Sequence, residues 1–286
     1  MVIPVALACA AQREQRHEWL STLPETIGRL QMAWSIQVGE PFQPGGQTAW
    51  VAPATRHRED LVLKVLWRHP EAEHEADGLR IWDGDGAVRL HAATEVDVQT
   101  TALLLERCRP GSTLEARPEL QQDLVVAGLL RRLWRQPPPA HRFRSLQSMC
   151  ERWADDFEHK TAGNPGVDPG LVRDGIALLR QLPASAERDV VLCTDLHAGN
   201  VLAAEREPWL VIDPKPHVGD PTYDALQHLL NCDTRLHTDP HGLLRRMAEL
   251  LELDPDRLQL WLFARCVQES PDWPSLAEVA RRVAPP

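Results

Sequence analysis

The sequence predicts an α+β protein of two lobes, because strand-like and helix-like segments are divided unevenly along its 286 residues. Short strand-like runs dominate the first third, whereas apolar positions at helical spacing dominate the remainder. A hydrophobic strand at 103–108 then runs into a loop that contains Pro110 and Gly111. We place the lobe boundary at this hinge, which gives an N-terminal lobe of residues 1–105 and a C-terminal lobe of residues 106–286.

The first lobe is predicted to begin with two short helices within residues 12–29, since Pro24 interrupts one helical pattern. Alternating apolar residues predict a strand at 32–38. Further strands are expected at 48–53, 61–66, 87–92 and 101–105, with a helix at 70–82. Gly45 and Gly46 lie between the first two strands, where they fit either a hairpin turn or a cover over nucleotide phosphates.

The second lobe is predicted to be mainly helical. Helices are expected at 120–133, 146–157, 171–182, 222–231, 241–253, 255–270 and 274–283, and a Gly/Pro-rich loop at 161–170. Short hydrophobic runs at 190–192, 201–202 and 209–212 are expected to be strands.

The overall composition excludes several classes of protein. A net charge of −10 argues against nucleic acid as the main partner, because no basic stripe could neutralise phosphates. No apolar run reaches the roughly 20 residues that a membrane span requires. The six cysteines are scattered and form no C-x-x-C pair, which favours free thiols in a reducing compartment. We expect a cytoplasmic protein that is a monomer or a weak dimer.

Three polar residues stand at the ends of hydrophobic runs between residues 190 and 220. Asp195 follows the run 190–192, Asn200 comes five residues later, and Asp213 ends the run 209–212. One carboxylate that takes a hydroxyl proton, with an Asn and a second carboxylate that hold Mg²⁺, is what metal-assisted phosphoryl transfer needs. The alternative is a β-hairpin with solvated polar turns, in which Asp and Asn are common.

A single lysine lies inside a hydrophobic strand of the first lobe. Lys64 is flanked by apolar residues on both sides, so it needs an edge position or an anionic partner. Glu71 and Glu75 lie one turn apart on the helix that follows, and Glu75 is the favoured partner. A strand lysine followed by a helix glutamate is how kinases position a ligand of the α- and β-phosphates. The alternative is a solvated edge lysine beside an acidic helix.

Taken in this order, these residues resemble the aminoglycoside phosphotransferase superfamily of protein-kinase-like enzymes. Within it, the chain resembles the branch of streptomycin 6-phosphotransferases and hydroxyurea phosphotransferases. The segments that carry this resemblance are Gly78-Leu-Arg-Ile-Trp-Asp-Gly-Asp-Gly-Ala-Val-Arg-Leu90, Leu104-Leu-Glu-Arg107, Asp195-Leu-His-Ala-Gly-Asn-Val-Leu202, Ile212-Asp-Pro-Lys-Pro216 and Gly219-Asp-Pro221. The resemblance implies a protein-kinase-like fold with an antiparallel sheet in the N-terminal lobe and a mainly helical C-terminal lobe.

The resemblance also implies roles for the catalytic residues. Asp195 would be the catalytic base or the carboxylate that orients the hydroxyl, and Asn200 and Asp213 would bind Mg²⁺. Asp224 would brace the catalytic loop from the start of a helix. The chain departs from the family at Cys193 and Thr194, because most members have His-Gly before the catalytic Asp.

For the nucleotide, the resemblance implies ATP held mainly in the first lobe. Lys64, held by Glu75, would contact the α- and β-phosphates. The backbone carbonyl of Glu106 and the backbone amide of Cys108 would meet the adenine. Gly45 and Gly46 would cover the phosphates.

The implied activity is transfer of the γ-phosphoryl group of ATP to a hydroxyl of a small molecule, either an aminoglycoside such as streptomycin or hydroxyurea, with resistance as the outcome. Asp220 and Glu269 are candidate ligands of a cationic acceptor. One alternative is a kinase that acts on an endogenous metabolite or sugar hydroxyl. Another is a catalytically silent nucleotide-binding module, which Cys193 and the poorly marked glycine loop suggest.

Overall fold

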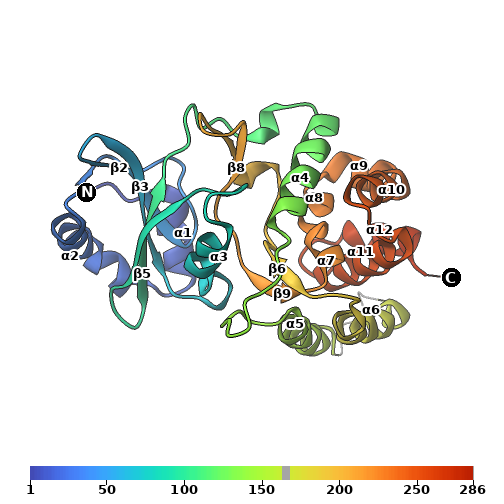
Figure 1. The fold of residues 1–286 in the computed structure, drawn as a ribbon. Helices are drawn as coiled ribbons and strands as arrows, with labels where there is room; N and C mark the ends of the chain where they lie inside the picture. The colour runs from blue at the N-terminus through green and yellow to red at the C-terminus, as the bar shows by residue number, and fades with distance from the viewer. Residues whose placement is uncertain (163–167, 286) are drawn as a thin grey trace. The chain divides into compact units, whose positions relative to one another are not determined.

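The computed structural model describes residues 1–162 and 168–285, so residues 163–167 of the loop predicted at 161–170 lie outside the described residues. The fold is α+β, as predicted (Figure 1). The chain divides into two compact units, of which one comprises Met1–Gly111 with Ala203–Leu210 and the other Ser112–Leu202 with Val211–Pro286. This division falls six residues after the predicted boundary and assigns a short later segment to the first unit.

The first unit is built on a five-stranded antiparallel sheet with the strand order β1-β2-β3-β5-β4. Its elements in chain order are α1 (Val5–Arg13), α2 (His17–Trp34), β1 (Gln37–Val38), β2 (Ala49–Arg56), β3 (Glu59–Trp67), α3 (Glu75–Trp82), β4 (Leu90–Glu95) and β5 (Thr100–Glu106). Of the strand predicted at 32–38, residues 37–38 form β1, because α2 extends through Trp34, and β4 begins three residues later than predicted.

The prediction of two short helices around Pro24 is wrong, because α2 runs through this proline. An interior proline removes one helical hydrogen bond and destabilises the helix. Here α2 buries Trp19, Leu23, Ile27 and Leu30 in the core of the unit. Burial of that apolar face offsets the local cost, since tertiary packing can override intrinsic helix preference.

Alternate residues of β3 explain how a lysine can lie inside this strand. Leu61, Leu63, Val65 and Trp67 belong to the core cluster that also contains the buried residues of α1 and α2. Successive side chains of a strand point to opposite faces of the sheet. Lys64 therefore points to the face opposite that cluster.

The second unit is mainly helical, as predicted. Its elements are α4 (Glu119–Leu133), α5 (Leu146–Thr161), α6 (Pro169–Gln181), β6 (Val190–Leu192), β9 (His217–Gly219), α7 (Pro221–Asp224), α8 (Leu226–Asn231), α9 (Asp233–Thr238), α10 (Pro240–Leu251), α11 (Pro255–Glu269) and α12 (Leu276–Val283). The strands β7 (Val201–Ala203) and β8 (Trp209–Val211) pair in a small sheet where the two units divide.

Helix α11 forms the centre of the second unit. It packs against α6, α10 and α12 and is continuously buried from Trp261 to Val267, a stretch that includes Leu262 and Phe263. A helix segment that is buried on all sides is expected at the centre of a helical core. Among the described helices, none is long and apolar enough to cross a membrane.

Candidate active site

Lys64 and Glu75 form a buried ion pair in the first unit. The Lys64 ammonium donates to both Glu75 carboxylate oxygens at 2.7 Å. The two residues are 6% and 1% exposed, respectively, so the pair is almost fully removed from water. The predicted pairing is therefore present, and the alternative of a solvated edge lysine is wrong.

The segment between Lys64 and Glu75 is less helical than the sequence predicts. Residues Pro70–Ala72 form a single 3₁₀ turn, and α3 begins at Glu75 itself. Glu75 therefore lies in the first turn of a helix, where backbone N–H groups favour negative charge.

Glu106 ends β5 and is held by charged partners within its own unit. Arg206 donates to both carboxylate oxygens at 2.9 Å, and the Arg89 backbone N–H donates at 3.0 Å. Burial alone would raise the pKa of Glu106, but these hydrogen bonds lower it below its ordinary value. Burial raises the pKa of the nearby Cys108 thiol to about 12, so this thiol stays protonated.

The backbone conformation and the surroundings of Gly45 require a glycine. Its φ of +81° is in the left-handed region, and an added Cβ would lie 2.5 Å from the Pro4 Cβ. Gly46 follows it in the loop between β1 and β2, which is where the sequence analysis located both glycines.

The second unit brings Asp195 and Asn200 together in the loop after β6. Strand β6 pairs antiparallel with β9 and ends at Leu192, three residues before Asp195. The Asn200 side-chain nitrogen donates to the Asp195 backbone oxygen at 2.9 Å and to its carboxylate at 3.3 Å. The Ile212 backbone N–H donates to the Asn200 carbonyl at 2.9 Å, which fixes the end of the loop to the segment before Asp213.

Asp213 joins this group through Lys215, a residue that the sequence analysis did not assign to the site. The Lys215 ammonium lies 2.9 Å from the Asp213 Oδ1 and 4.0 Å from the Asp195 Oδ2. The three predicted polar residues are therefore neighbours, with a cation between the two carboxylates. The composition of the sequence could have pointed to Lys215. Only three of the 31 Lys and Arg residues are lysines, and two of these three lie in the candidate sites.

The loop that carries Asp195 is braced by Asp224, as predicted. Its carboxylate accepts from the backbone N–H groups of Cys193 at 3.0 Å and Thr194 at 2.6 Å, and from the Trp134 indole at 3.0 Å. Thr194 has a φ of +53°, a strained value for a β-branched residue. The Asp224 bond and a 2.5 Å bond from the Thr194 hydroxyl to the Lys215 carbonyl hold this conformation.

Asp224 gives a testable pH dependence. Burial raises its pKa from 3.8 to about 6, against the opposing effect of its hydrogen-bond donors. The associated stability is fully present below pH 3.8 and is lost as the pH rises through about 6. The difference in the free energy of unfolding between wild type and Asp224→Asn should therefore shrink by about 2 kcal/mol between pH 4.5 and pH 7. Urea denaturation across this range measures it. A difference that grows with pH would show that the amide donors keep the carboxylate ionised.

The two candidate acceptor ligands have different environments. Asp220 is 3% exposed, caps α7 through the Thr222 N–H, and accepts from Arg257 and Trp261 at 2.7 Å. Its carboxylate is thus used inside the protein, which gives Asp220 a structural role. Glu269 instead lines a cavity of about 350 Å³ in the second unit, where its carboxylate accepts from the Arg265 guanidinium at 2.7 Å.

The cavity beside Glu269 carries polar and aromatic groups from α8, α9 and the segment before α12. Its lining includes Gln227, Asn231, Asp233 and Trp273. The Asp233 carboxyl group is 86% exposed and Trp273 is 65% exposed. Ligand sites in proteins usually span roughly 300–1,000 Å³. The cavity is therefore large enough for a small molecule.

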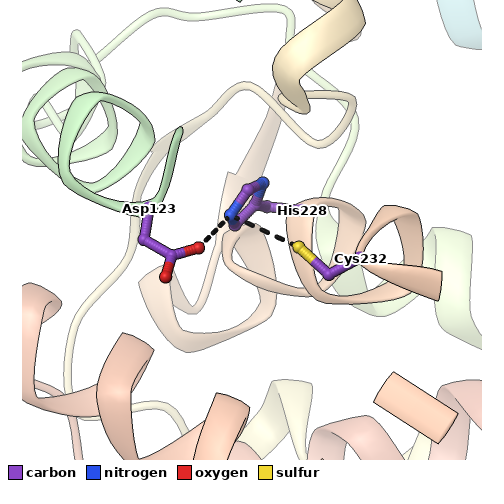
Figure 2. A group of neighbouring side chains, drawn as sticks. All are labelled: Asp123, His228 and Cys232. Atoms are coloured by element: carbon purple, nitrogen blue, oxygen red, sulfur yellow. Dashed lines mark hydrogen bonds and ion pairs between the residues drawn. The ribbon is translucent and has the colours of Figure 1, made fainter. Parts of the chain in front are cut away.

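A second polar cluster, formed by Asp123, His228 and Cys232, has the residue types of a metal site (Figure 2). Asp123 is fully buried on α4, and the other two residues come from α8 and its end. However, Arg235 donates to both Asp123 carboxylate oxygens at 3.0 Å and Arg246 donates at 2.6 Å. Two guanidinium groups at the carboxylate oppose a bound cation, so we interpret the cluster as a structural ion-pair network.

Comparison with known proteins gives consistent matches over most of the chain. A family model described as aminoglycoside/hydroxyurea antibiotic resistance kinase matches residues 36–275. The chain is 32% identical to a streptomycin 6-kinase of Streptomyces glaucescens, covering 94% of this chain and 89% of that protein. It is 35% identical to a hydroxyurea phosphotransferase of Kitasatospora aureofaciens, covering 88% of this chain and 73% of that protein.

A solved structure shows the same fold. It is a thermostable mutant of the aminoglycoside phosphotransferase APH(4)-Ia in a ternary complex with ADP and hygromycin B. The match has a TM-score of 0.56 and 14% identity, and covers 90% of this chain and 95% of that one. The predicted protein-kinase-like fold is therefore confirmed.

Proposed function

The chain belongs to the aminoglycoside/hydroxyurea antibiotic resistance kinase family, and we propose that it transfers the γ-phosphoryl group of ATP to a small antibiotic and so confers resistance. Members of this family are phosphotransferases that act on hydroxyl groups. The observation that carries this proposal is the assembly of Asp195, Asn200 and Asp213 around one loop end.

In the proposed reaction Asp195 accepts a hydrogen bond from the acceptor hydroxyl and takes its proton during transfer. Asn200 holds the Asp195 carboxylate through its side-chain nitrogen, so its amide oxygen is the atom suited to a metal. That oxygen and the Asp213 carboxylate are hard ligands of the kind that Mg²⁺ prefers. Mg²⁺ would neutralise phosphate charge when bound.

We propose that Lys64 contacts the phosphates of ATP and that Glu75 fixes its position. The buried pair supports this role, because the two bonds at 2.7 Å allow the ammonium little freedom. Backbone groups of Glu106 and Cys108 remain the candidate contacts of the adenine. Gly45 and Gly46 remain candidates for covering the phosphates.

The cavity beside Glu269 is the proposed acceptor site. The Asp233 carboxylate, which is 86% exposed, and the exposed face of Trp273 favour a cationic acceptor through charge and cation–π attraction. The Glu269 carboxylate is already paired with Arg265, so it is the weaker candidate ligand. Streptomycin is cationic and hydroxyurea is neutral, so the lining favours a streptomycin-like aminoglycoside. Asp220 is excluded from this proposed site because Arg257 and Trp261 already occupy its carboxylate.

The test is incubation with ATP and Mg²⁺ and a panel containing streptomycin, hydroxyurea, and metabolites and sugars with free hydroxyls. We expect a phosphorylated aminoglycoside, identified by mass spectrometry. A product formed exclusively from a metabolite would instead support a kinase with an endogenous acceptor. Nucleotide binding without any phosphorylated product would support the catalytically silent module.

The acceptor site gives a second testable outcome. The variant Asp233→Asn should raise the KM for a cationic acceptor about threefold, which is roughly 0.6 kcal/mol of lost attraction. The kcat should change little, because Asp233 does not belong to the loop that carries Asp195. The matched control is hydroxyurea as acceptor, whose KM should not change. An unchanged KM for the cationic acceptor would remove the cavity from the proposal.

A further inference from the structure

Lysine is rare in this chain, and its positions are therefore informative. The sequence has three lysines, Lys64, Lys160 and Lys215, among 31 Lys and Arg residues. Lys160 forms an exposed pair with Asp272 on the surface of the second unit. Arginine has a planar fork that binds one carboxylate at two points, whereas lysine is a compact charge that several oxygens can share. A lysine between two carboxylates suits the second arrangement.

The backbone of Lys215 is fastened to the catalytic loop. Its N–H donates to the Cys193 carbonyl at 2.9 Å, and its own carbonyl accepts from the Thr194 hydroxyl at 2.5 Å and the His217 ring at 3.0 Å. Prolines at 214 and 216 restrict the chain on both sides. The side chain is 14% exposed. The bonds that set the loop therefore also fix the backbone of Lys215, and the contact with Asp213 holds its ammonium.

The Lys215 ammonium lies between the carboxylates of the proposed base and the proposed metal ligand. It is 2.9 Å from the proposed metal ligand Asp213 and 4.0 Å from the proposed base Asp195. An ammonium group has three donors, so it can contact a further anion while it keeps a carboxylate partner. The acceptor oxygen bound to Asp195 is the atom that phosphorus must approach. A cation at this distance from Asp195 lies where negative phosphoryl oxygens must pass.

We propose that Lys215 is a catalytic residue that binds the phosphoryl group during its transfer, an inference that rests on the proposed function. The acceptor oxygen forms a bond to the γ-phosphorus while the bond from that phosphorus to the bridging oxygen breaks. The electron pair of the broken bond leaves with ADP, and the hydroxyl proton passes to Asp195. Lys215 keeps its protons throughout and stabilises charge on the transferring group.

The competing explanation is that Lys215 merely neutralises Asp195 and Asp213. The two explanations differ in how nucleotide binding should respond to loss of the charge. A phosphoryl ligand should discriminate between AMP-PNP, which carries a γ-phosphoryl group, and ADP, which does not. A residue that merely organises the two carboxylates should affect both nucleotides alike or neither.

The experiment compares wild type with Lys215→Met and Lys215→Gln by calorimetry with ADP and AMP-PNP in the presence of Mg²⁺, together with turnover. We expect ADP affinity within about twofold of wild type and AMP-PNP affinity lower by about tenfold, as for the loss of one charge-assisted contact. Turnover should fall by about 10² or more. Lys160→Met is the matched control and should bind both nucleotides as wild type does.

The assignment would be overturned if a folded Lys215 variant had the same ratio of AMP-PNP affinity to ADP affinity as wild type. Equal losses of affinity for both nucleotides would give this result. Thermal unfolding establishes that each variant is folded, and Lys215→Gln keeps a donor toward Asp213 if the Met variant is unstable. Failure of the proposed function gives a different result. Wild type would then phosphorylate no acceptor, while the affinity ratio of the variants would still decide whether Lys215 contacts a γ-phosphoryl group. Absence of nucleotide binding by wild type would overturn both proposals.

Discussion

Replacing Asp195 with asparagine is expected to lower turnover by a factor of about 10² to 10⁴, the usual contribution of a positioned base. Asparagine has nearly the same shape and can still accept the 3.3 Å hydrogen bond from Asn200 through its amide oxygen. It cannot take a proton from the acceptor hydroxyl. The loss should therefore appear in kcat, while the affinities for nucleotide and acceptor stay close to those of wild type.

Asp189→Asn is the matched control for this variant. Asp189 is exposed and directly precedes β6, so its substitution makes the same chemical change six residues away. Turnover of this control should equal that of wild type. If Asp195→Asn also kept full turnover, Asp195 would not be the base, and the catalytic loop would need another assignment.

Replacing Asp123 with alanine is expected to lower the free energy of unfolding by about 3–5 kcal/mol, because it removes one partner of a buried charge network. Asp123 is fully buried and accepts from His228, Arg235 and Arg246 (Figure 2 shows the histidine contact). Without the carboxylate, two guanidinium groups would face each other near the core. Urea denaturation at neutral pH measures the loss.

The Asp123 network also predicts sensitivity to acid. Burial alone would raise the pKa of Asp123, but hydrogen bonds from His228 and the two arginines lower it well below its ordinary value. The stability that the carboxylate contributes is present above its unfolded pKa of about 4 and is lost as the pH falls further. The difference between wild type and Asp123→Ala should therefore narrow in strong acid.

Glu119→Ala is the control for this network. Glu119 lies on the same helix and pairs with Arg235 at 3.6 Å, but its side chain is 45% exposed. Exposed ion pairs contribute roughly 0–1 kcal/mol. Equal losses in the two variants would mean that burial of Asp123 does not determine its contribution.

The candidate site residues were predictable because local sequence positions them. Asp195 and Asp213 come after short hydrophobic strands, Asn200 directly precedes one, and Lys64 and Glu75 are separated by 11 residues. Short separations leave few possible arrangements, so residue type and spacing were sufficient to bring these residues together. The protein-kinase-like fold was expected from the family resemblance that these residues carry.

Features that depend on distant residues were not predictable. The partners of Asp123 are 105, 112 and 123 residues away in the chain, and the Asp220–Arg257 pair joins residues 37 apart. Nothing near Asp220 in the sequence indicates that its carboxylate is buried. Likewise, Pro24 signals a helix break locally, and only the packing of α2 on the sheet explains why the helix continues.

In the proposed function, this chain moves a phosphoryl group from ATP to a small-molecule hydroxyl by means of Asp195. The most direct measurement is the mass of the acceptors in the panel after incubation with Mg²⁺ and ATP, with wild type and Asp195→Asn side by side. We expect one acceptor to gain the mass of a single phosphoryl group with wild type, and almost none of this product with the variant. ADP production without any phosphorylated acceptor, or the same product yield from both proteins at equal times, would contradict the claim.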